Sequence, residues 1–133
     1  MSKIFTRSLN KLASPKERVF QLTYKDLRVH ADLFDMIGLD RSPFAKLNIH
    51  VGAAYGDKPF ALDNFCRNFE RLPESVRSRL TVENDDKQSL YSTKELYDTV
   101  YRRIGTPIVF DYHHYRLHPD GQTEVDALLT ALD

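Results

Sequence analysis

The sequence has a single cysteine, no net charge and no long apolar run. One thiol, Cys66, excludes an intramolecular disulfide framework and fits a reducing compartment. No stretch approaches the ~20 apolar residues that a membrane-spanning helix needs, and residues 1–12 lack the apolar centre of a secretory signal. We therefore expect a soluble, cytoplasmic protein with no membrane partner.

The charge balance gives no support for DNA binding, and the length excludes a complete TIM barrel. Nineteen basic and nineteen acidic residues cancel, so the basic excess that is typical of nucleic-acid-binding proteins is missing. Any contact with DNA would have to depend on local chemistry. The 133 residues suit one domain, but a complete TIM barrel needs roughly 250 residues. The chain is therefore long enough for only part of such a barrel.

Segments with helical spacing alternate with short apolar segments along the chain. The pattern predicts helices after Ser14, over about 59–72, from Ser92 to Gly105 and after Thr123. Ser14 and Glu17 have the spacing of a capping box, as do Ser92 and Glu95. Strands are predicted at 47–51, 80–83 and 107–111. Strands that alternate with helices pair in parallel through right-handed crossovers. We expect one α/β domain over residues 1–133, and periodicity alone leaves open whether its sheet is flat or part of a barrel.

Each predicted strand ends in a residue that can bind a metal. The first ends at His50, the second at Glu83 and the third at Asp111, with His114 three residues further on. The carboxyl ends of parallel strands lie on one face, which is where α/β proteins place their sites. Imidazole and carboxylate ligands suit Zn²⁺ or Mn²⁺. A carboxylate such as Glu83 can bridge two ions, and paired ions can hold the attacking and leaving oxygens of a phosphodiester.

Simpler interpretations exist for the same residues. A single His or Asp at a strand end is more often an ordinary loop residue, and only its recurrence on three strands favours a metal site. The glycine-containing loop after His50 carries Tyr55, which could stack on a base, and Lys58, which could neutralise a phosphate. Lys87, in the acidic loop after the second strand, is a further candidate for DNA binding. A plain strand-to-helix turn with Lys58 in solvent is an equal alternative.

Other polar residues are assigned structural roles. Cys66 lies between Phe65 and Phe69 and is expected in the core, without a nucleophilic function. His118 is expected to be a loop residue and not a ligand. The arginines of the middle segment are expected to form a solvated outer face; they are Arg67, Arg71, Arg77 and Arg79.

With these motifs assembled, the sequence resembles the UV-damage endonuclease (UvdE) family. The matching segments are His-Val-Gly at 50–52, Tyr-Gly-Asp-Lys at 55–58, Leu-Pro-Glu at 72–74, Val-Glu-Asn-Asp-Asp-Lys at 82–87 and Val-Phe-Asp at 109–111. The resemblance implies a TIM barrel related to endonuclease IV that uses divalent metals, often Mn²⁺, to nick damaged double-stranded DNA on the 5′ side of UV photoproducts. Zn²⁺ and Mg²⁺ are the alternative ions.

The resemblance also implies a role for each candidate ligand. His50 corresponds to a ligand of the first metal, Glu83 to the carboxylate between the first and second, Asp111 to a ligand of the second and His114 to a ligand of the third. Glu83 and Asp111 are therefore the expected catalytic residues.

The sequence departs from the family pattern at both ends. A His-Pro-Gly-Gln type strand is missing before Ser14, and so are the later strands that supply further ligands. We therefore expect a partial TIM barrel with about three parallel strands, corresponding to strands four to six of eight, and an incomplete or inactive enzyme. Its open edges are expected to favour self-association. The alternatives are a metal-dependent sugar isomerase or epimerase of the related barrel group, and a non-catalytic remnant.

Overall fold

The computed structural model describes residues 4–5 and 11–133, and these contain a sheet of four parallel strands. The strands follow one another in space as they do in the sequence: β1 (Ile4–Phe5), β2 (Leu47–Ile49), β3 (Leu80–Glu83) and β4 (Ile108–Val109). The last three are the predicted strands, joined by helical crossovers, so the α/β prediction is confirmed. The two-residue strand β1 was not predicted, because so short a segment has no detectable alternation.

Helix α1 (Glu17–Met36) is one uninterrupted helix of 20 residues. Its buried face carries apolar residues and Thr23 at helical spacing, and Thr23 does not break the helix. The predicted cap at Ser14 is wrong. The Oγ of Ser14 accepts a hydrogen bond from the Lys16 backbone N–H at 3.2 Å, in a turn before the helix, and Lys16 stands at the N-cap position. Leu12, Ala13 and Ser14 are buried, so the chain before the helix packs against the same core as α1.

The next helix lies where the pattern predicted one, over about residues 59–72. Asp57 caps α2 (Lys58–Glu70) by accepting a hydrogen bond from the Phe60 N–H at 3.1 Å. Pro73 stands at the N-cap position of the short helix α3 (Glu74–Arg77). This extra turn leads directly into β3.

A longer helical segment connects β3 with β4. It consists of α4 (Thr93–Glu95), a π-helical part η1 (Leu96–Tyr101) and α5 (Arg102–Ile104). The capping box is confirmed, because the Glu95 N–H donates to Ser92 Oγ at 3.1 Å and the Ser92 N–H donates to Glu95 Oε2 at 2.9 Å. The segment ends at Gly105, whose φ of 70° lies in the left-handed region that favours glycine.

Two helices follow β4. The first, α6 (Tyr112–Leu117), was not predicted, although Asp111 is its N-cap residue and accepts a hydrogen bond from the His114 N–H at 2.9 Å. The second, α7 (Glu124–Leu132), begins after Thr123 as predicted.

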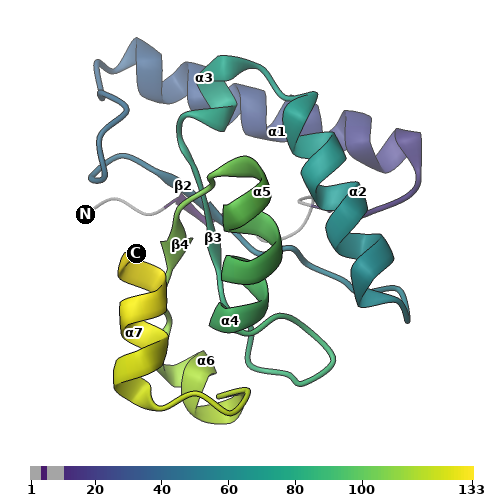
Figure 1. The fold of residues 1–133 in the computed structure, drawn as a ribbon. Coiled ribbons are helices and arrows are strands. Elements are labelled where there is room, and N and C mark those ends of the chain that lie inside the picture. Colours follow the sequence, from purple (N-terminus) through teal and green to yellow (C-terminus); the bar gives the residue numbers. More distant parts are fainter. Residues whose placement is uncertain (1–3, 6–10) are drawn as a thin grey trace.

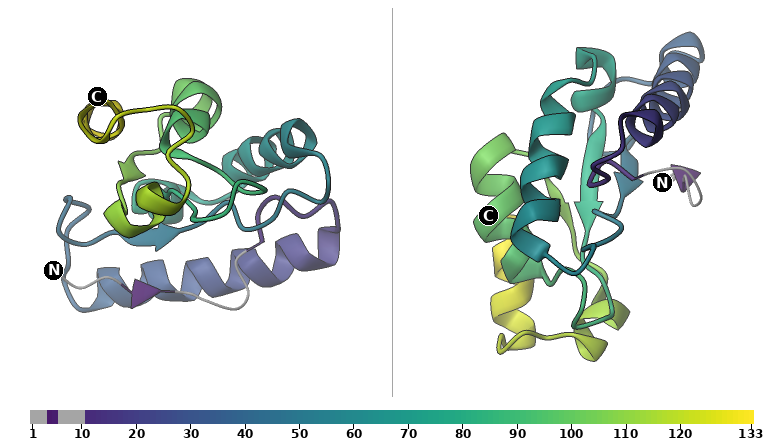
Figure 2. Two further views of the ribbon diagram at one scale, coloured as in Figure 1. Left: turned by 90° about the horizontal axis from the view of Figure 1, so that it is seen from below. Right: turned by 90° about the vertical axis from the view of Figure 1, so that its right-hand side faces the viewer.

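The helices are arranged in an arc around the sheet (Figures 1 and 2). Seen from below, in the left panel of Figure 2, α1, α2, α5 and α7 succeed one another around it. Apolar residues from the inner sides of α1 and α2 meet the strand residues in one continuous core, which includes Phe34, Phe65 and Val82. An arc of helices outside parallel strands is the architecture of a TIM barrel, of which this chain forms a part.

Arg79 corrects one of the sequence predictions. Its side chain is fully buried, whereas a solvated outer face was expected. The guanidinium group donates to Oδ1 of Asp35, in the last turn of α1, at 2.7 Å and to three backbone oxygens of the loop after α1; these belong to Leu39, Asp40 and Ala45. Buried backbone carbonyl groups in a loop need hydrogen-bond donors, so the buried cation satisfies several acceptors at once.

The structure bears on two further expectations, which concern the single cysteine and membrane-spanning helices. Cys66 is buried as a free thiol, and burial raises its pKa to about 11, which agrees with a core residue and not a nucleophile. None of the helices in the described residues combines the length and apolarity needed to cross a lipid bilayer.

Candidate metal centre

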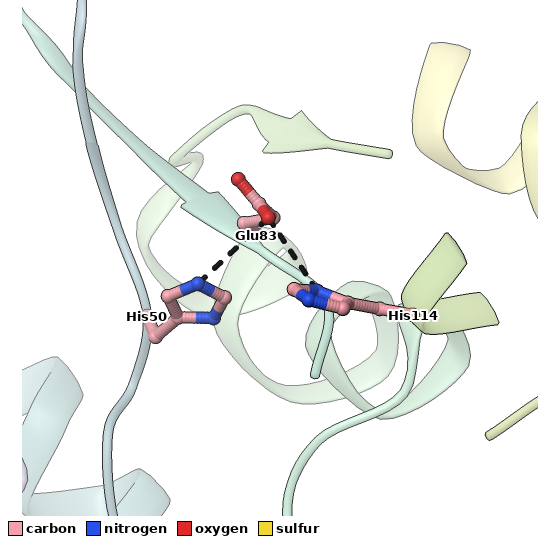
Figure 3. A group of neighbouring side chains, drawn as sticks. All are labelled: His50, Glu83 and His114. Atoms are coloured by element: carbon pink, nitrogen blue, oxygen red, sulfur yellow. Dashed lines mark ion pairs between the residues drawn. The ribbon is translucent and has the colours of Figure 1, made fainter. Parts of the chain in front are cut away.

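Three side chains meet beyond the carboxyl ends of the strands. His50 directly follows β2, Glu83 is the last residue of β3, and His114 lies in the first turn of α6. One ligand atom from each lies within 4.8 Å of the other two. Figure 3 shows both imidazole rings pointing toward the carboxyl group of Glu83. Residues that are more than 60 positions apart in the sequence therefore form one cluster.

Glu83 is the centre of this cluster. Its Oε1 lies 3.8 Å from Nε2 of His50 and 3.5 Å from Nδ1 of His114. Its Oε2 accepts a hydrogen bond from the side-chain amide of Asn48, whose own oxygen accepts one from the Thr81 hydroxyl at 3.0 Å. One carboxylate oxygen is thus fixed by the sheet, and the other faces the two histidines.

The carboxyl group of Glu83 is nearly inaccessible, with 4% of its side chain exposed. Burial raises its pKa above the usual range, and a hydrogen bond with the Asp111 carboxyl group acts in the same direction. For Asp111, burial also acts to raise the pKa. The backbone N–H of His114 and the hydrogen bond with Glu83 outweigh this effect, so the pKa of Asp111 lies below its usual range. Of the two groups, Glu83 therefore holds a proton more readily.

His50 is placed between two carboxylates. Its Nδ1 lies 2.9 Å from Oδ1 of Asp85, a close contact that is not aligned as an ideal hydrogen bond, while its Nε2 faces Glu83. The interaction with Asp85 is the main cause of a raised pKa for His50, and burial opposes it. With Nδ1 occupied by Asp85, the lone pair of Nε2 is available on the side of Glu83.

His114 and Asp111 are held by Asn84. The Nδ1 of His114 lies 2.8 Å from the backbone oxygen of Asn84. The Asn84 side chain bonds the Asp111 backbone twice, accepting from its N–H at 2.7 Å and donating to its carbonyl oxygen at 3.0 Å. Asp111 Oδ2 lies 3.7 Å from His114 Nδ1. Asp111 therefore lies at the edge of the cluster, in contact with two of its members.

The donor set fits a divalent transition metal. In such sites imidazole nitrogens and carboxylate oxygens each lie about 2.0–2.2 Å from the ion, and the 3.8 Å between Nε2 of His50 and Oε1 of Glu83 leaves that space. The Nδ1 of His114 donates to the Asn84 carbonyl oxygen, so His114 would bind an ion through its other nitrogen, Nε2. The three carboxyl groups of Glu83, Asp85 and Asp111 meet only two imidazoles here. Buried carboxylates are ordinarily paired with a cation or bound to a metal, so a divalent ion would supply the charge that this cluster lacks.

The structure brings together His50, Glu83 and His114, and it places Asp111 beside them, as the strand-end pattern predicted. The residues proposed to bind DNA lie in the surrounding loops. Tyr55 is exposed, and its φ of 51° is a left-handed conformation that is unfavourable for a bulky residue. Lys58 forms an ion pair of 2.8 Å with Glu95, and Lys87 is exposed. Their roles remain predictions.

The sequence analysis missed the residues that hold His50, Glu83 and Asp111 in place. Asn48, Asn84 and Asp85 are all buried, although each is polar. For Asn48 a signal existed, because a lone amide inside an apolar strand requires a buried partner. Asn84 and Asp85 belong to an acidic loop segment, which resembles a solvated surface until the fold is known.

Three comparisons with known proteins bear on this site. Residues 5–130 match the family model described as UV-endonuclease UvdE. The chain is 40% identical over 116 residues to the UV DNA damage endonuclease of Bacillus velezensis and 36% identical over 116 residues to that of Bacillus pumilus. It superposes on the crystal structure of SacUVDE with a TM-score of 0.88 at 32% identity.

The chain corresponds to only part of these proteins. The two Bacillus matches cover 87% of this chain but 35% of the relatives' length. The structural match covers 97% of this chain and 42% of SacUVDE. The described strands and helices are therefore equivalent to one portion of a longer barrel.

Proposed function

Because the chain belongs to the UV-endonuclease UvdE family, we propose that it carries the metal-binding part of a metal-dependent endonuclease that nicks DNA on the 5′ side of UV photoproducts in the cytoplasm. The observation that carries the proposal is the convergence of His50, Glu83 and His114 within 4.8 Å. It occurs in a chain that is 40% identical to a UV DNA damage endonuclease. We treat residues 1–133 as a single partial-barrel domain.

The proposed ligands are His50, Glu83, Asp111 and His114, and the preferred ion is Mn²⁺, with Zn²⁺ or Mg²⁺ as alternatives. When bound, such ions neutralise phosphodiester charge and make a water molecule a stronger nucleophile. Within the chain, Asn48 orients Glu83 so that one carboxylate oxygen faces both imidazoles. Asp111 acts with Glu83 as the second catalytic carboxylate, held by its cap of α6.

Loops at the same rim are proposed to contact the DNA. Tyr55 is exposed and strained, and strain of this kind is often retained at functional sites. We assign it to stacking against a base or sugar. Lys87 is assigned to a phosphate contact, and so is Lys58, which must exchange Glu95 for a phosphate oxygen.

The test combines metal binding with nicking. We expect the purified chain to bind at least one Mn²⁺ tightly, measured by calorimetry and elemental analysis. We expect little nicking of UV-irradiated supercoiled plasmid by the chain alone, because the matched segment corresponds to 35% of the length of the Bacillus velezensis enzyme. Placing its matching segment into the Bacillus velezensis enzyme should retain nicking of irradiated plasmid, with unirradiated plasmid as the control.

Less than one tightly bound ion per chain would contradict the proposal and favour a non-catalytic remnant. A chimera that folds and binds metal but does not nick irradiated DNA would contradict the assignment of catalytic residues to this segment. The sugar isomerase or epimerase alternative receives no support from the family match.

We also propose that the open edges of the partial barrel bind a second copy of the chain. Among the described residues, β1 and β4 each pair on one side only. Next to β4, α7 exposes four large apolar side chains: Val125, Leu128, Leu129 and Leu132. A TIM barrel has eight parallel strands, so two copies with four strands each would supply the full number and cover both edges.

The expected result is a concentration-dependent dimer with about twice the 15.5 kDa mass of the chain, measured by size-exclusion chromatography with light scattering. Replacing Leu129 and Leu132 with Glu should shift the protein to monomer. The matched control is Phe60→Glu, which adds an acid at an exposed position of α2, the helix between the inner strands β2 and β3. A wild-type monomer at every concentration would contradict the pairing.

A further inference from the structure

The acidic loop after β3 contains one buried carboxylate, that of Asp85, whereas the neighbouring Asp86 is half-buried. Asp85 is 6% exposed, whereas Lys87 two residues later is exposed. Asp85 does not belong to the group of three that can hold a metal ion. Its two oxygens have separate partners. Oδ1 lies 2.9 Å from Nδ1 of His50, and Oδ2 accepts a hydrogen bond from the Tyr91 backbone N–H at 3.3 Å.

Tyr91 holds Asp85 in this position. The backbone N–H of Asp85 donates to the Tyr91 carbonyl oxygen at 2.8 Å. Together with the bond from the Tyr91 N–H to Oδ2, this joins the start and the end of the loop formed by residues 85–91. Tyr91 is fully buried, and its hydroxyl donates to the Ala53 carbonyl oxygen at 3.0 Å in the loop after His50. The residue after Tyr91 is Ser92, the cap of α4. The Asp85 carboxylate is therefore fixed relative to both loops.

This short contact bears on which nitrogen of His50 carries the proton in the neutral ring. A carboxylate next to Nδ1 favours the tautomer with hydrogen on Nδ1, and the lone pair is then on Nε2. That lone pair faces Oε1 of Glu83, 3.8 Å away. A histidine that binds a metal through one nitrogen commonly donates its other N–H to a carboxylate in this way.

We propose that Asp85 is a positioning residue that fixes the tautomer and the ring orientation of His50. The proposal rests on the proposed function only in taking Nε2 of His50 as a metal ligand. Asp85 itself touches neither Glu83 nor His114 in this assignment. It acts through His50, and Tyr91 acts through Asp85.

Asp85→Asn tests the proposal, because the new side chain has only one oxygen and the buried Tyr91 N–H needs it as an acceptor. The single amide oxygen of the new side chain satisfies that N–H, which leaves the amide NH₂ directed at Nδ1 of His50. Nδ1 must then accept, and the ring proton moves to Nε2, on the side of Glu83. We expect this variant to bind Mn²⁺ about 10–100-fold more weakly, with little change in melting temperature. Asp86→Asn is the matched control, since it removes the same charge one residue away and should leave the affinity unchanged.

The tautomer can be read without any metal. Long-range ¹H–¹⁵N spectra of the metal-free protein, at a pH where the imidazole is neutral, should show hydrogen on Nδ1 of His50 in the wild type and on Nε2 in Asp85→Asn, with His50→Gln used to assign the signals. Hydrogen on Nε2 in the wild type would overturn the proposal. So would equal losses of affinity in Asp85→Asn and Asp86→Asn.

These outcomes are separate from failure of the proposed function. If the wild type bound no metal, the proposed function would fail, and the spectra would still decide the role of Asp85. If Asp85→Asn did not fold, the wild-type spectrum would still decide it, together with partial rescue of affinity by Asp85→Glu.

Discussion

Replacing Glu83 with Gln is expected to abolish most metal binding without weakening the fold. Glu83 is the one member of the cluster that approaches both histidines, at 3.8 and 3.5 Å. A neutral amide cannot supply the negative charge that a divalent ion requires, so we expect the Mn²⁺ affinity to fall at least 100-fold. Loss of a supporting residue alone commonly costs about 10–100-fold, and loss of the ligand should cost more.

The metal-free Glu83→Gln protein should be as stable as the wild type, or more so. Burial opposes ionisation of Glu83 and raises its pKa, and a neutral side chain of the same size does not carry that cost. The Asn48 amide can still donate to the amide oxygen of the Gln side chain. At a metal concentration 100 times the wild-type dissociation constant, binding stabilises the wild type by about 2.7 kcal/mol. The variant should lack this increase in thermal unfolding.

His118→Ala is the control for this experiment. His118 is also buried, but it lies at the end of α6 and does not belong to the cluster. Calorimetry with Mn²⁺ should show nearly wild-type affinity for this variant. Equal losses of affinity in Glu83→Gln and His118→Ala would contradict the site assignment.

Among the substitutions considered for this chain, Arg79→Met is expected to cause the largest decrease in the free energy of unfolding. The apolar part of the side chain is retained, but the donors to Asp35 and to the carbonyl oxygens of Leu39, Asp40 and Ala45 are removed. Leaving a buried acceptor without its donor costs about 1–3 kcal/mol, and three carbonyl oxygens lose the same donor group here. Urea unfolding followed by circular dichroism should show a decrease of this size in the free energy of unfolding.

Arg67→Met provides the comparison. Arg67 is 61% exposed and forms an ion pair with Asp63 at 3.1 Å, one helical turn away. An exposed pair of this kind contributes about 0–1 kcal/mol. If the two variants lost similar stability, Arg79 would not act as the buried anchor that its contacts indicate.

The sequence was most informative about the strands and about the residues that cluster at their ends. Parallel strands covered by helices must be apolar, so a His or an acid at the end of such a segment stands out. His50 and Glu83 were found by this reasoning. His114 was found through its spacing from Asp111, even though α6 was not predicted. The reasoning depends on a rule of topology, that the carboxyl ends of parallel strands share one face.

The sequence was least informative where a polar residue is buried by contacts that are distant in the sequence. Arg79 and Arg77 look equivalent in the sequence, yet only Arg79 faces the end of α1, about 40 residues away. Asp85 and Asp86 are likewise adjacent acids, and only Asp85 faces His50. Composition and periodicity do not distinguish such neighbours, because the distinction is created by packing.

The two ends of strand β3 lie in different environments. Arg79 immediately precedes its first residue and secures the loop after α1, whereas Glu83 is its last residue and faces the two imidazoles. A rise of about 3.3 Å per residue separates these positions by about 13 Å, beyond the range at which substitutions usually influence one another. Substitutions around Glu83 can therefore change the properties of the site during evolution while the contacts of Arg79 with the loop after α1 are kept.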